Sequence, residues 1–310
     1  MFLRSAFLQV RDFVRSPEAM ASVWTENDAL AYTRSLATSH YENFNVVSFL
    51  LPKRLHQDFY NVYSYCRWAD DLGDEMGGPA ESLRLLEWWR GELAAMYEGR
   101  PLRHPVFVAL RPTAERYGIP REPFVHLIDA FVQDQTETRY RTWQDLFAYC
   151  RNSANPVGRL VLYLCGYSDE ARQRLSDATC TALQLANFWQ DVTVDLEKDR
   201  IYLPLEALEK HGSSFEDVLE RRPTPQFRAA MREAVDRARE FFVTGRPLAR
   251  MVDARLSVDL ELFSRGGLQV LRKIERMDYD VLAGRPTISK AERVGLLIGT
   301  LLRFALKRAA

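Results

Sequence analysis

Apolar residues recur three and four positions apart along nearly the whole chain, which is the period of an amphipathic α-helix. Two such stripes comprise Leu83, Leu86, Trp89, Leu93 and Met96, and Phe124, Leu127, Ile128 and Phe131. The strict alternation typical of half-buried strands is missing over any length. The pattern therefore predicts an all-α protein of about ten or more helices.

Proline and glycine mark the predicted ends of these helices. They gather in short gaps at 77–79, 99–101, 118–120 and 284–286. Thr142 has an N-cap side chain with Asp145 three positions on, and Thr224 precedes Pro225, a residue favoured in the first helical turn. We therefore expect helices to begin at Thr142 and Thr224.

No Pro/Ser-rich linker divides the chain, so we expect one large helical domain over 25–310, preceded by an N-terminal arm over 1–24. The last two helices are expected over 256–282 and 287–306. The most apolar stretch, 294–306, is shorter than the roughly 20 residues that span a bilayer.

Composition removes several classes of function. The 310 residues include 42 Lys and Arg against 42 Asp and Glu, and a zero net charge argues against a broad nucleic-acid surface. Dinucleotide-binding and P-loop glycine motifs are absent from the sequence, and the five histidines form no metal-binding pattern. Four cysteines without a CxxC pair predict free thiols in a cytoplasmic protein: Cys66, Cys150, Cys165 and Cys180.

Carboxylates gather at the end of a predicted helix over 58–75. Asp70, Asp71 and Asp74 are three and four positions apart, so they share one helix face. Like charges at that spacing repel by about 0.2–0.5 kcal/mol per pair, and a helix C-terminus disfavours anions. This arrangement calls for a compensating cation.

A second set repeats this pattern at Asn187, Asp191 and Asp195, again on one face and after a small, apolar helix. All-oxygen ligand sets without His or Cys favour Mg²⁺, which proteins commonly hold with a few carboxylates plus substrate phosphate. Two alternatives remain open: solvated helix ends with chance acids, and a glycosidase with two catalytic carboxyls.

Specific motifs accompany these carboxylates. The stretch 63–75 reads YSYCRWADDLGDE, 184–195 reads QLANFWQDVTVD, and 149–158 reads YCRNSANPVG. LLP occurs at 50–52, and RIYLP follows the second motif. From about 39 to 282 the chain resembles the squalene/phytoene synthase family, whose members have the all-α class I terpenoid (isoprenoid) synthase fold with a central active-site cavity.

The resemblance implies roles for particular residues. The implied metal ligands are Asp70, Asp71, Asp74, Asn187, Asp191 and Asp195. The implied substrate or diphosphate contacts are Arg67, Asn43, Asn45, Gln184, Gln190, Arg200, Val157 and Leu183. The implied catalytic residues are Tyr63, Tyr149, Ser153 and Asn155. The corresponding cofactor is Mg²⁺, with Mn²⁺ as a substitute, and the substrate is a prenyl diphosphate.

Departures from the family pattern indicate a particular reaction. Coupling members commonly have an apolar, glycine-containing VAG stretch where this chain has Ser153 and Asn155, and Arg where it has Gln190. Hydroxyl and amide groups in an otherwise dry cavity favour an ordered water, which would capture the carbocation as an alcohol. The chain therefore resembles the hydroxysqualene synthase branch, which converts presqualene diphosphate and water to hydroxysqualene in squalene and hopanoid biosynthesis.

Two other functions remain open. One is head-to-head condensation of prenyl diphosphates to presqualene diphosphate, squalene or phytoene, and the other is a non-catalytic helical assembly protein. No NADPH site is evident in the sequence, so we expect none.

The expected location is cytoplasmic, with any membrane contact peripheral and at the inner face. The last helix, from Thr287, has basic residues around an apolar stripe, as an interfacial helix would, but the favoured interpretation is a final core helix with a basic last turn. Expected partners are the prenyl diphosphate and neighbouring squalene-pathway enzymes, with no nucleic acid.

Overall fold

The computed structural model describes residues 10–39 and 51–309, except for the side chains of 303 and 305–309. Within these ranges all regular structure is helical, apart from one isolated bridge between Arg139 and Ile201. The all-α prediction is therefore confirmed. The chain forms two compact units, the first comprising Met1–Thr136 and Arg159–Ser168, and the second Glu137–Gly158 and Asp169–Ala310. The predicted limits of arm and domain stay a prediction.

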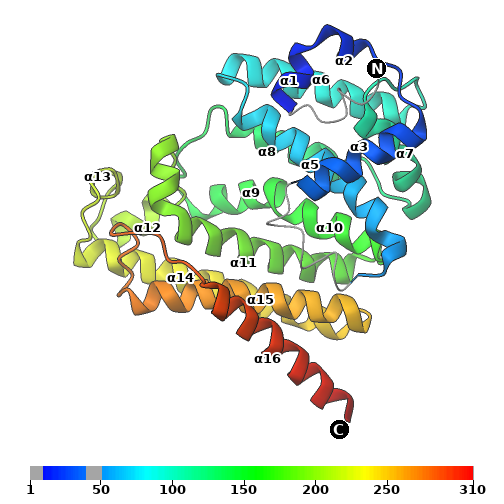
Figure 1. Ribbon diagram of the computed structural model, residues 1–310. Coiled ribbons are helices and arrows are strands. Elements are labelled where there is room, and N and C mark those ends of the chain that lie inside the picture. The colour runs from blue at the N-terminus through cyan, green and yellow to red at the C-terminus, as the bar shows by residue number, and fades with distance from the viewer. Residues whose placement is uncertain (1–9, 40–50, 310) are drawn as a thin grey trace. The chain divides into compact units, whose positions relative to one another are not determined.

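The first unit is built around α5 (Figure 1). Its helical elements are α1 (Val10–Arg15), α2 (Pro17–Ala21), α3 (Glu26–Ser39), η2 (Lys53–Leu55), α5 (His56–Asp74), α6 (Pro79–Tyr97), α7 (Pro105–Tyr117) and α8 (Glu122–Gln133). Helix α5 packs against α3, α6, α7 and α8. Its buried Trp68 stacks on Trp89 of α6 with ring centroids 5.3 Å apart, which anchors the middle of α5 in the core.

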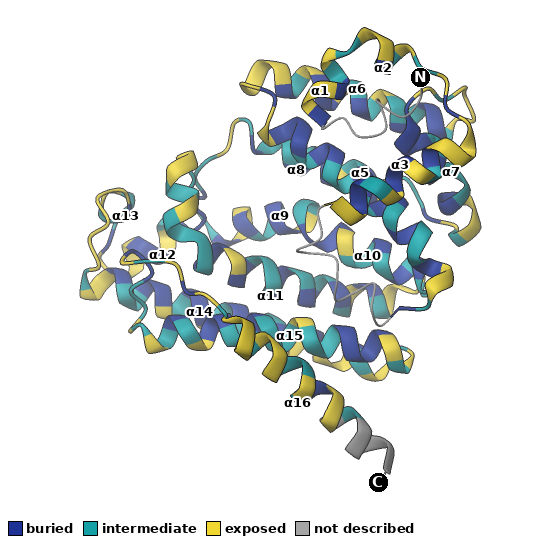
Figure 2. Cartoon of the chain, viewed as in Figure 1, coloured by how far each residue is buried: buried dark blue, intermediate teal, exposed yellow. Residues whose placement is uncertain are grey.

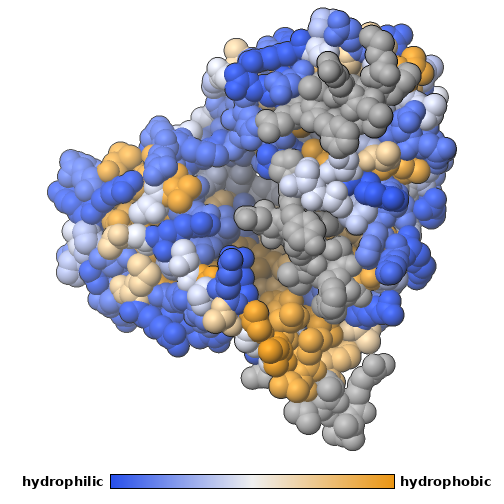
Figure 3. All heavy atoms as spheres, in the orientation of Figure 1, coloured by the Kyte–Doolittle hydropathy of each residue, from blue (hydrophilic) through white to orange (hydrophobic). Residues whose placement is uncertain are grey.

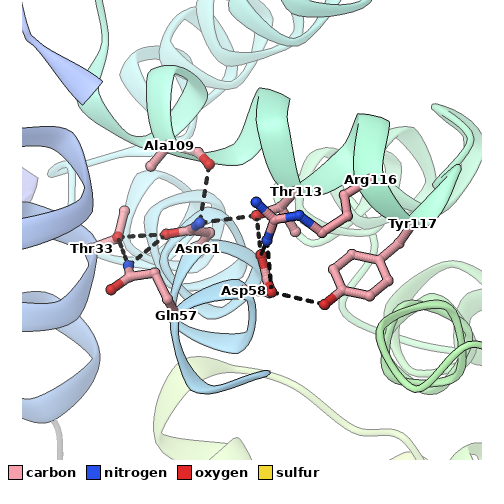
Figure 4. Close-up of polar contacts among 8 residues, drawn as sticks. All are labelled: Thr33, Gln57, Asp58, Asn61, Ala109, Thr113, Arg116 and Tyr117. Atoms are coloured by element: carbon pink, nitrogen blue, oxygen red, sulfur yellow. Dashed lines mark hydrogen bonds and ion pairs between the residues drawn. The ribbon is translucent and has the colours of Figure 1, made fainter. Parts of the chain in front are cut away.

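A buried carboxylate ties the start of α5 to α7 (Figure 4). Asp58 is 3% exposed and accepts hydrogen bonds from Thr113 Oγ1 at 2.8 Å, Arg116 Nη1 at 3.0 Å and Tyr117 Oη at 2.9 Å. A buried carboxylate is tolerated only when its oxygens are paired in this way. The network therefore fixes the position of α5 along α7.

The next turn of α5 continues the network. Asn61 donates from Nδ2 to the carbonyl oxygen of Ala109 and to Thr113 Oγ1, both at 3.0 Å, and its Oδ1 accepts from Thr33 Oγ1 at 2.7 Å (Figure 4). Gln57 Nε2 donates to the same Oδ1 at 3.0 Å. Because Thr33 belongs to α3, this one amide sets α5 against two neighbouring helices.

The second unit is built around the long helix α11. Its elements are α9 (Trp143–Ser153), the start of α10 (Asn155–Leu164), α11 (Glu170–Asp195), η3 (Leu196–Lys198), α12 (Leu205–Lys210), α13 (Phe215–Leu219), α14 (Pro225–Gly245), η4 (Arg246–Arg250), α15 (Ala254–Arg276) and α16 (Lys290–Ala309). Helices α14 and α15 pack along α11, each with a buried stripe and an exposed stripe (Figure 2).

Two glycines allow close helix contact in this unit. A Cβ on Gly158 would lie 2.4 Å from Cys180 Sγ and Ser176 Oγ, and one on Gly245 would lie 2.2 Å from Thr179 Oγ1. No side chain fits at those separations, so glycine lets α10 and the end of α14 approach α11.

Most predicted boundaries are confirmed. Thr142 forms a capping box with Asp145, and Thr224 Oγ1 accepts from the N–H of Phe227. The helix expected over 256–282 instead ends at Arg276, because the chain then turns through Asp278 and Tyr279 at positive φ. The last helix begins at Lys290 and not at 287. All four cysteines are free, as expected.

Candidate active site

The first acidic motif lies on the last turns of α5, and its cation comes from the same helix. Arg67 lies one turn before the carboxylates, with Nη1 3.4 Å from Asp70 Oδ2 and Nη2 3.3 Å from Glu75 Oε1. Its Nη2 also forms an ion pair with Oδ1 of Asp71. Part of the charge that disfavours this cluster is therefore neutralised within α5 itself.

Burial separates the carboxylates of this motif. The Asp71 side chain is 6% exposed, that of Asp70 is 47% exposed, and Asp74 is exposed. Desolvation raises the pKa of Asp71 to about 7, although Arg67 opposes the shift, and the charges of Glu75 and Asp70 add to it. Burial also raises the pKa of Tyr63, one turn before Arg67. Asp70 and Asp74 are thus the members best placed to meet a ligand from solvent.

The end of α5 is held by side chains from outside the helix. The carbonyl oxygen of Gly73 accepts from Ser82 Oγ at 3.0 Å and from Gln135 Nε2 at 3.2 Å. Helix C-termini leave such carbonyls without an intrahelical partner. These two bonds fix the turn that carries Asp74.

The second acidic motif ends α11, and its cation comes from a distant loop. Asp191 Oδ1 lies 2.5 Å from Arg285 Nε, and its Oδ2 lies 3.2 Å from Arg285 Nη2. The neighbouring Gln190 donates from Nε2 to the carbonyl oxygen of Pro286 at 2.6 Å. Arg285 was not among the predicted site residues, since its only signal in the sequence is a cation inside the glycine–proline gap at 284–286.

Asp195 has an unusual environment. Its Oδ2 is buried and has no hydrogen-bond partner among the described residues. Desolvation raises its pKa to about 7, and the charge of Asp191 adds to the shift, while Arg200 and Lys198 oppose it. Asn187, two turns earlier, is exposed. A buried carboxylate oxygen without a donor is where a cation would be stabilising.

Both motifs offer the hard oxygen donors that Mg²⁺ prefers, and the unpartnered Asp195 oxygen fits such an ion. Among the described residues, no three His, Cys, Asp or Glu side chains are arranged to hold a metal on their own. Any Mg²⁺ bound here would have to take its remaining ligands from water or phosphate oxygens.

The predicted water-holding residues lie around the junction of α9 and α10. Asn155 is 7% exposed, and its Oδ1 accepts from Thr181 Oγ1 of α11 at 2.9 Å. That bond leaves the Nδ2 donors for other partners. Ser153 Oγ donates to the carbonyl oxygen of Tyr149 at 3.0 Å, so its lone pairs remain as acceptors.

Aromatic rings pack beside the second motif. Phe188 of α11 stacks on Tyr202 with centroids 3.7 Å apart, and Tyr149 packs against Tyr140 and Tyr202. Tyr149 is buried in this cluster. Its ring helps to position the second motif, whose Asp191 and Asp195 follow Phe188 on α11.

The remaining predicted residues are placed as follows. Val157 is 43% exposed and so lies outside the packed core. Leu183 and Gln184 are partly buried on α11, and a Cβ on Gly267 would lie 3.1 Å from Leu183. Asn43 and Asn45 lie outside the described residues. Arg200 follows η3, and its N–H bonds to the carbonyl oxygen of Asp195 at 2.9 Å. Each motif is assembled within its own unit.

Solved structures share this helical architecture. A squalene synthase HpnC from Alicyclobacillus acidocaldarius is 44% identical, with a TM-score of 0.79 over 82% of this chain and 95% of that one. A dehydrosqualene synthase solved with a ligand, 23% identical, has a TM-score of 0.80 over 90% of this chain and 98% of that one. The chain therefore has the all-α isoprenoid synthase fold, as its motifs predicted.

Comparison with related sequences identifies the family within this fold. The squalene/phytoene synthase family model matches residues 37–292, so the chain belongs to that family. A phytoene synthase from Thermus thermophilus is 35% identical and aligns over 84% of this chain and 88% of its own length. A hydroxysqualene synthase from Rhodopseudomonas palustris is 32% identical and aligns over 79% of this chain and 83% of its own length. The family is enzymatic and acts in isoprenoid biosynthesis on prenyl diphosphates.

None of the described helices is both long and apolar enough to cross a lipid bilayer.

Proposed function

We propose that this protein converts presqualene diphosphate and water into hydroxysqualene and diphosphate. The bond between carbon and the diphosphate oxygen breaks, and its electron pair leaves with the diphosphate. The resulting cyclopropylcarbinyl cation rearranges as carbon–carbon bonds of the ring break and the chain carbons are joined, which gives an open-chain allylic cation. A water oxygen then donates a pair to this cation, and the proton released from that water leaves with the diphosphate. The balance needs no reductant, so the proposal includes no NADPH.

The observation that carries the proposal is the polar pair Ser153 and Asn155, in place of an apolar VAG stretch. Asn155 is buried and oriented by Thr181, so its Nδ2 can hold a water in a fixed direction. An amide orients a water without competing strongly as a nucleophile. Gln190 has its Nε2 engaged by Pro286, which leaves Oε1 as an acceptor.

The charged residues would bind and orient the diphosphate end. Arg67 and Arg200 are the cations proposed to contact it, and Tyr63, with its raised pKa, stays protonated and can donate a hydrogen bond. Asp70 and Asp74 of the first motif and Asn187, Asp191 and Asp195 of the second would hold Mg²⁺, while Asp71 is paired with Arg67. Bound Mg²⁺ neutralises charge on the leaving diphosphate.

Product analysis tests the reaction. The protein is incubated with Mg²⁺ and presqualene diphosphate without NADPH, and in parallel with farnesyl or geranylgeranyl diphosphate. We expect hydroxysqualene from the first substrate and no condensation product from the others. Presqualene diphosphate, squalene or phytoene formed by condensation would contradict the proposal.

Head-to-head condensation is the second candidate, favoured by the 35% identity to a phytoene synthase. The variant Ser153→Val/Asn155→Gly separates the two reactions. If these residues hold the attacking water, it still releases diphosphate but forms less alcohol and more hydrocarbon. Thr181→Val, which removes only the partner of Asn155, should shift the products the same way to a smaller extent. An unchanged alcohol fraction at reduced rate would assign these residues a structural role.

A further inference from the structure

Polar side chains of the last helix, α16, contact α15. Arg265 Nη1 donates to Thr300 Oγ1 at 2.6 Å, and Thr300 is 4% exposed. Glu292, near the start of the same helix, pairs with Lys273 Nζ at 2.9 Å and accepts from Gln269 Nε2 at 3.3 Å. Polar contacts and an ion pair therefore fix α16 to α15.

The outward face of α16 is apolar. Val294, Ile298, Leu301 and Leu302 are 54%, 51%, 41% and 59% exposed. They are spaced four, three and one positions apart, which places them on one side of the helix. Figure 3 shows hydrophobic side chains gathered where Figure 1 draws α16, and Figure 2 shows exposed residues along it. A surface helix normally turns its apolar residues to the core, and α16 buries Leu296 and Leu297 only in part while this second stripe stays exposed.

Charge indicates what would cover this face, which we name the α16 apolar face. Helix α16 contains five basic residues, at 290, 293, 303, 307 and 308, and one acidic residue, Glu292. Glu292 is already paired with Lys273, and Lys290 and Arg293 are exposed. A basic helix with an exposed apolar stripe suits the interface of a membrane that contains anionic lipid.

A second copy of the chain fits this surface less well. A symmetric pair would bring the same face of each copy together, and so would set two positively charged helices side by side. Anionic lipid headgroups would instead attract the positive charge of each helix. We propose that the α16 apolar face docks on the surface of a bilayer containing anionic lipid, without crossing it. This inference does not depend on the reaction proposed above.

Vesicle sedimentation tests the docking. The full-length protein is mixed with vesicles of phosphatidylcholine alone, or with vesicles in which a third of the lipid is phosphatidylglycerol. We expect binding to the anionic vesicles, weakened by added salt, and about tenfold or more weaker binding for Ile298→Glu/Leu302→Glu. The control Leu219→Glu/Val243→Glu adds the same charge at exposed apolar positions of α13 and α14, and should bind like the unchanged protein.

Several results would overturn the proposal. These are equal binding to both kinds of vesicle, equal loss in both double variants, or no binding at all. A concentration-dependent dimer that Ile298→Glu/Leu302→Glu abolishes, without vesicle binding, would assign the face to a second copy. Thermal unfolding of each variant is measured alongside, and should be unchanged because all four substituted side chains are exposed.

Discussion

The acidic face of α5 pairs with Arg67, one helical turn earlier in the same helix. The acidic face of α11 pairs with Arg285, which lies 94 positions further along the chain. Arg67 pairs with Asp70 and Asp71 at i+3 and i+4, so any formation of α5 brings these charges together. Arg285 lies in the loop between α15 and α16, and it reaches Asp191 only when that loop is in place.

The two motifs also differ in which of their carboxylates is paired with an arginine. In the first motif the most buried member, Asp71, has the cation, while Asp70 and Asp74 remain more exposed. In the second motif the cation pairs with Asp191, and Asp195 keeps a buried oxygen without a partner among the described residues. We infer that the first motif is neutralised locally and the second relies on the loop and on any bound ion.

Replacing one carboxylate from each motif should have the largest effect. We expect Asp70→Ala and Asp191→Ala each to lower turnover on the order of 10³-fold, because each would remove a proposed ligand of the Mg²⁺ that would neutralise the leaving diphosphate. Glu197→Ala, a nearby exposed acid outside both motifs, is the matched control. Turnover of diphosphate release measures all three. Near-normal rates in both motif variants would show that the two acidic motifs do not share a role in catalysis.

A substitution at the start of α5 should weaken the packing of the helix that carries the first motif. Asp58→Ala should lower the free energy of unfolding by about 2 kcal/mol, because Thr113 and Tyr117 lose their acceptor in a buried network. Asp129→Ala removes a more exposed ion pair with Arg90 in the same unit, and should cost less than about 1 kcal/mol. Urea unfolding measures both. Equal losses would show that the Asp58 network does not set the stability of α5.

The two cations should differ in their contribution to stability. At pH 8, Arg67→Ala should cost about 1–2 kcal/mol, because it leaves the buried carboxylate of Asp71 without its cation. Arg285→Ala should cost less than about 1 kcal/mol, because its side chain is 47% exposed and pairs near solvent. The same unfolding experiment decides, and a larger loss for Arg285→Ala would reverse the order.

The smallest expected effect is on pH dependence, in protein kept metal-free with a chelator. The pKa of Asp195 rises from 3.8 to about 7 on folding, so between these values the native state holds a proton that the unfolded chain releases. Stability therefore falls as pH rises through this window. The Asp195→Asn variant should be as stable as the unchanged protein near pH 3.8 and more stable than it at pH 8.

Asp71→Asn is the comparison variant, since the pKa of Asp71 also rises to about 7. Its gain at pH 8 should be smaller, because the amide no longer forms the ion pair with Arg67. Thermal unfolding across this pH range provides the measurement. A gain for Asp71→Asn as large as that for Asp195→Asn would mean that Arg67 contributes little.

Local signals in the sequence predicted most of the helices. The caps at Thr142 and Thr224 and the acidic ends of α5 and α11 depend on residues a few positions apart, and all are confirmed. The end of α15 was missed, because the turn at Asp278 and Tyr279 needs positive φ at residues that carry no glycine signal.

Long-range contacts could not be predicted in this way. Arg285 lies far along the chain from Asp191, and Asp58 gains its partners on α7 only through packing. A final core helix was the favoured interpretation of α16, because a stripe of apolar residues fixes the side of a helix but not what that side faces. Thr300 and Glu292 hold α16 to α15 through long-range contacts, while Val294, Ile298, Leu301 and Leu302 stay exposed.

The distance between Asp191 and Arg285 also has a consequence during synthesis. A ribosome adds about 5–20 residues per second, so the 94 positions between them take on the order of 5–20 s to make. The nascent α11 would carry its carboxylates through that interval before Arg285 exists, whereas α5 is made with Arg67 already in place. During that interval Asp191 of the emerging second unit lacks its partner, and the adjacent Lys198 and Arg200 are the nearest cations made along the chain that can offset the acidic helix end.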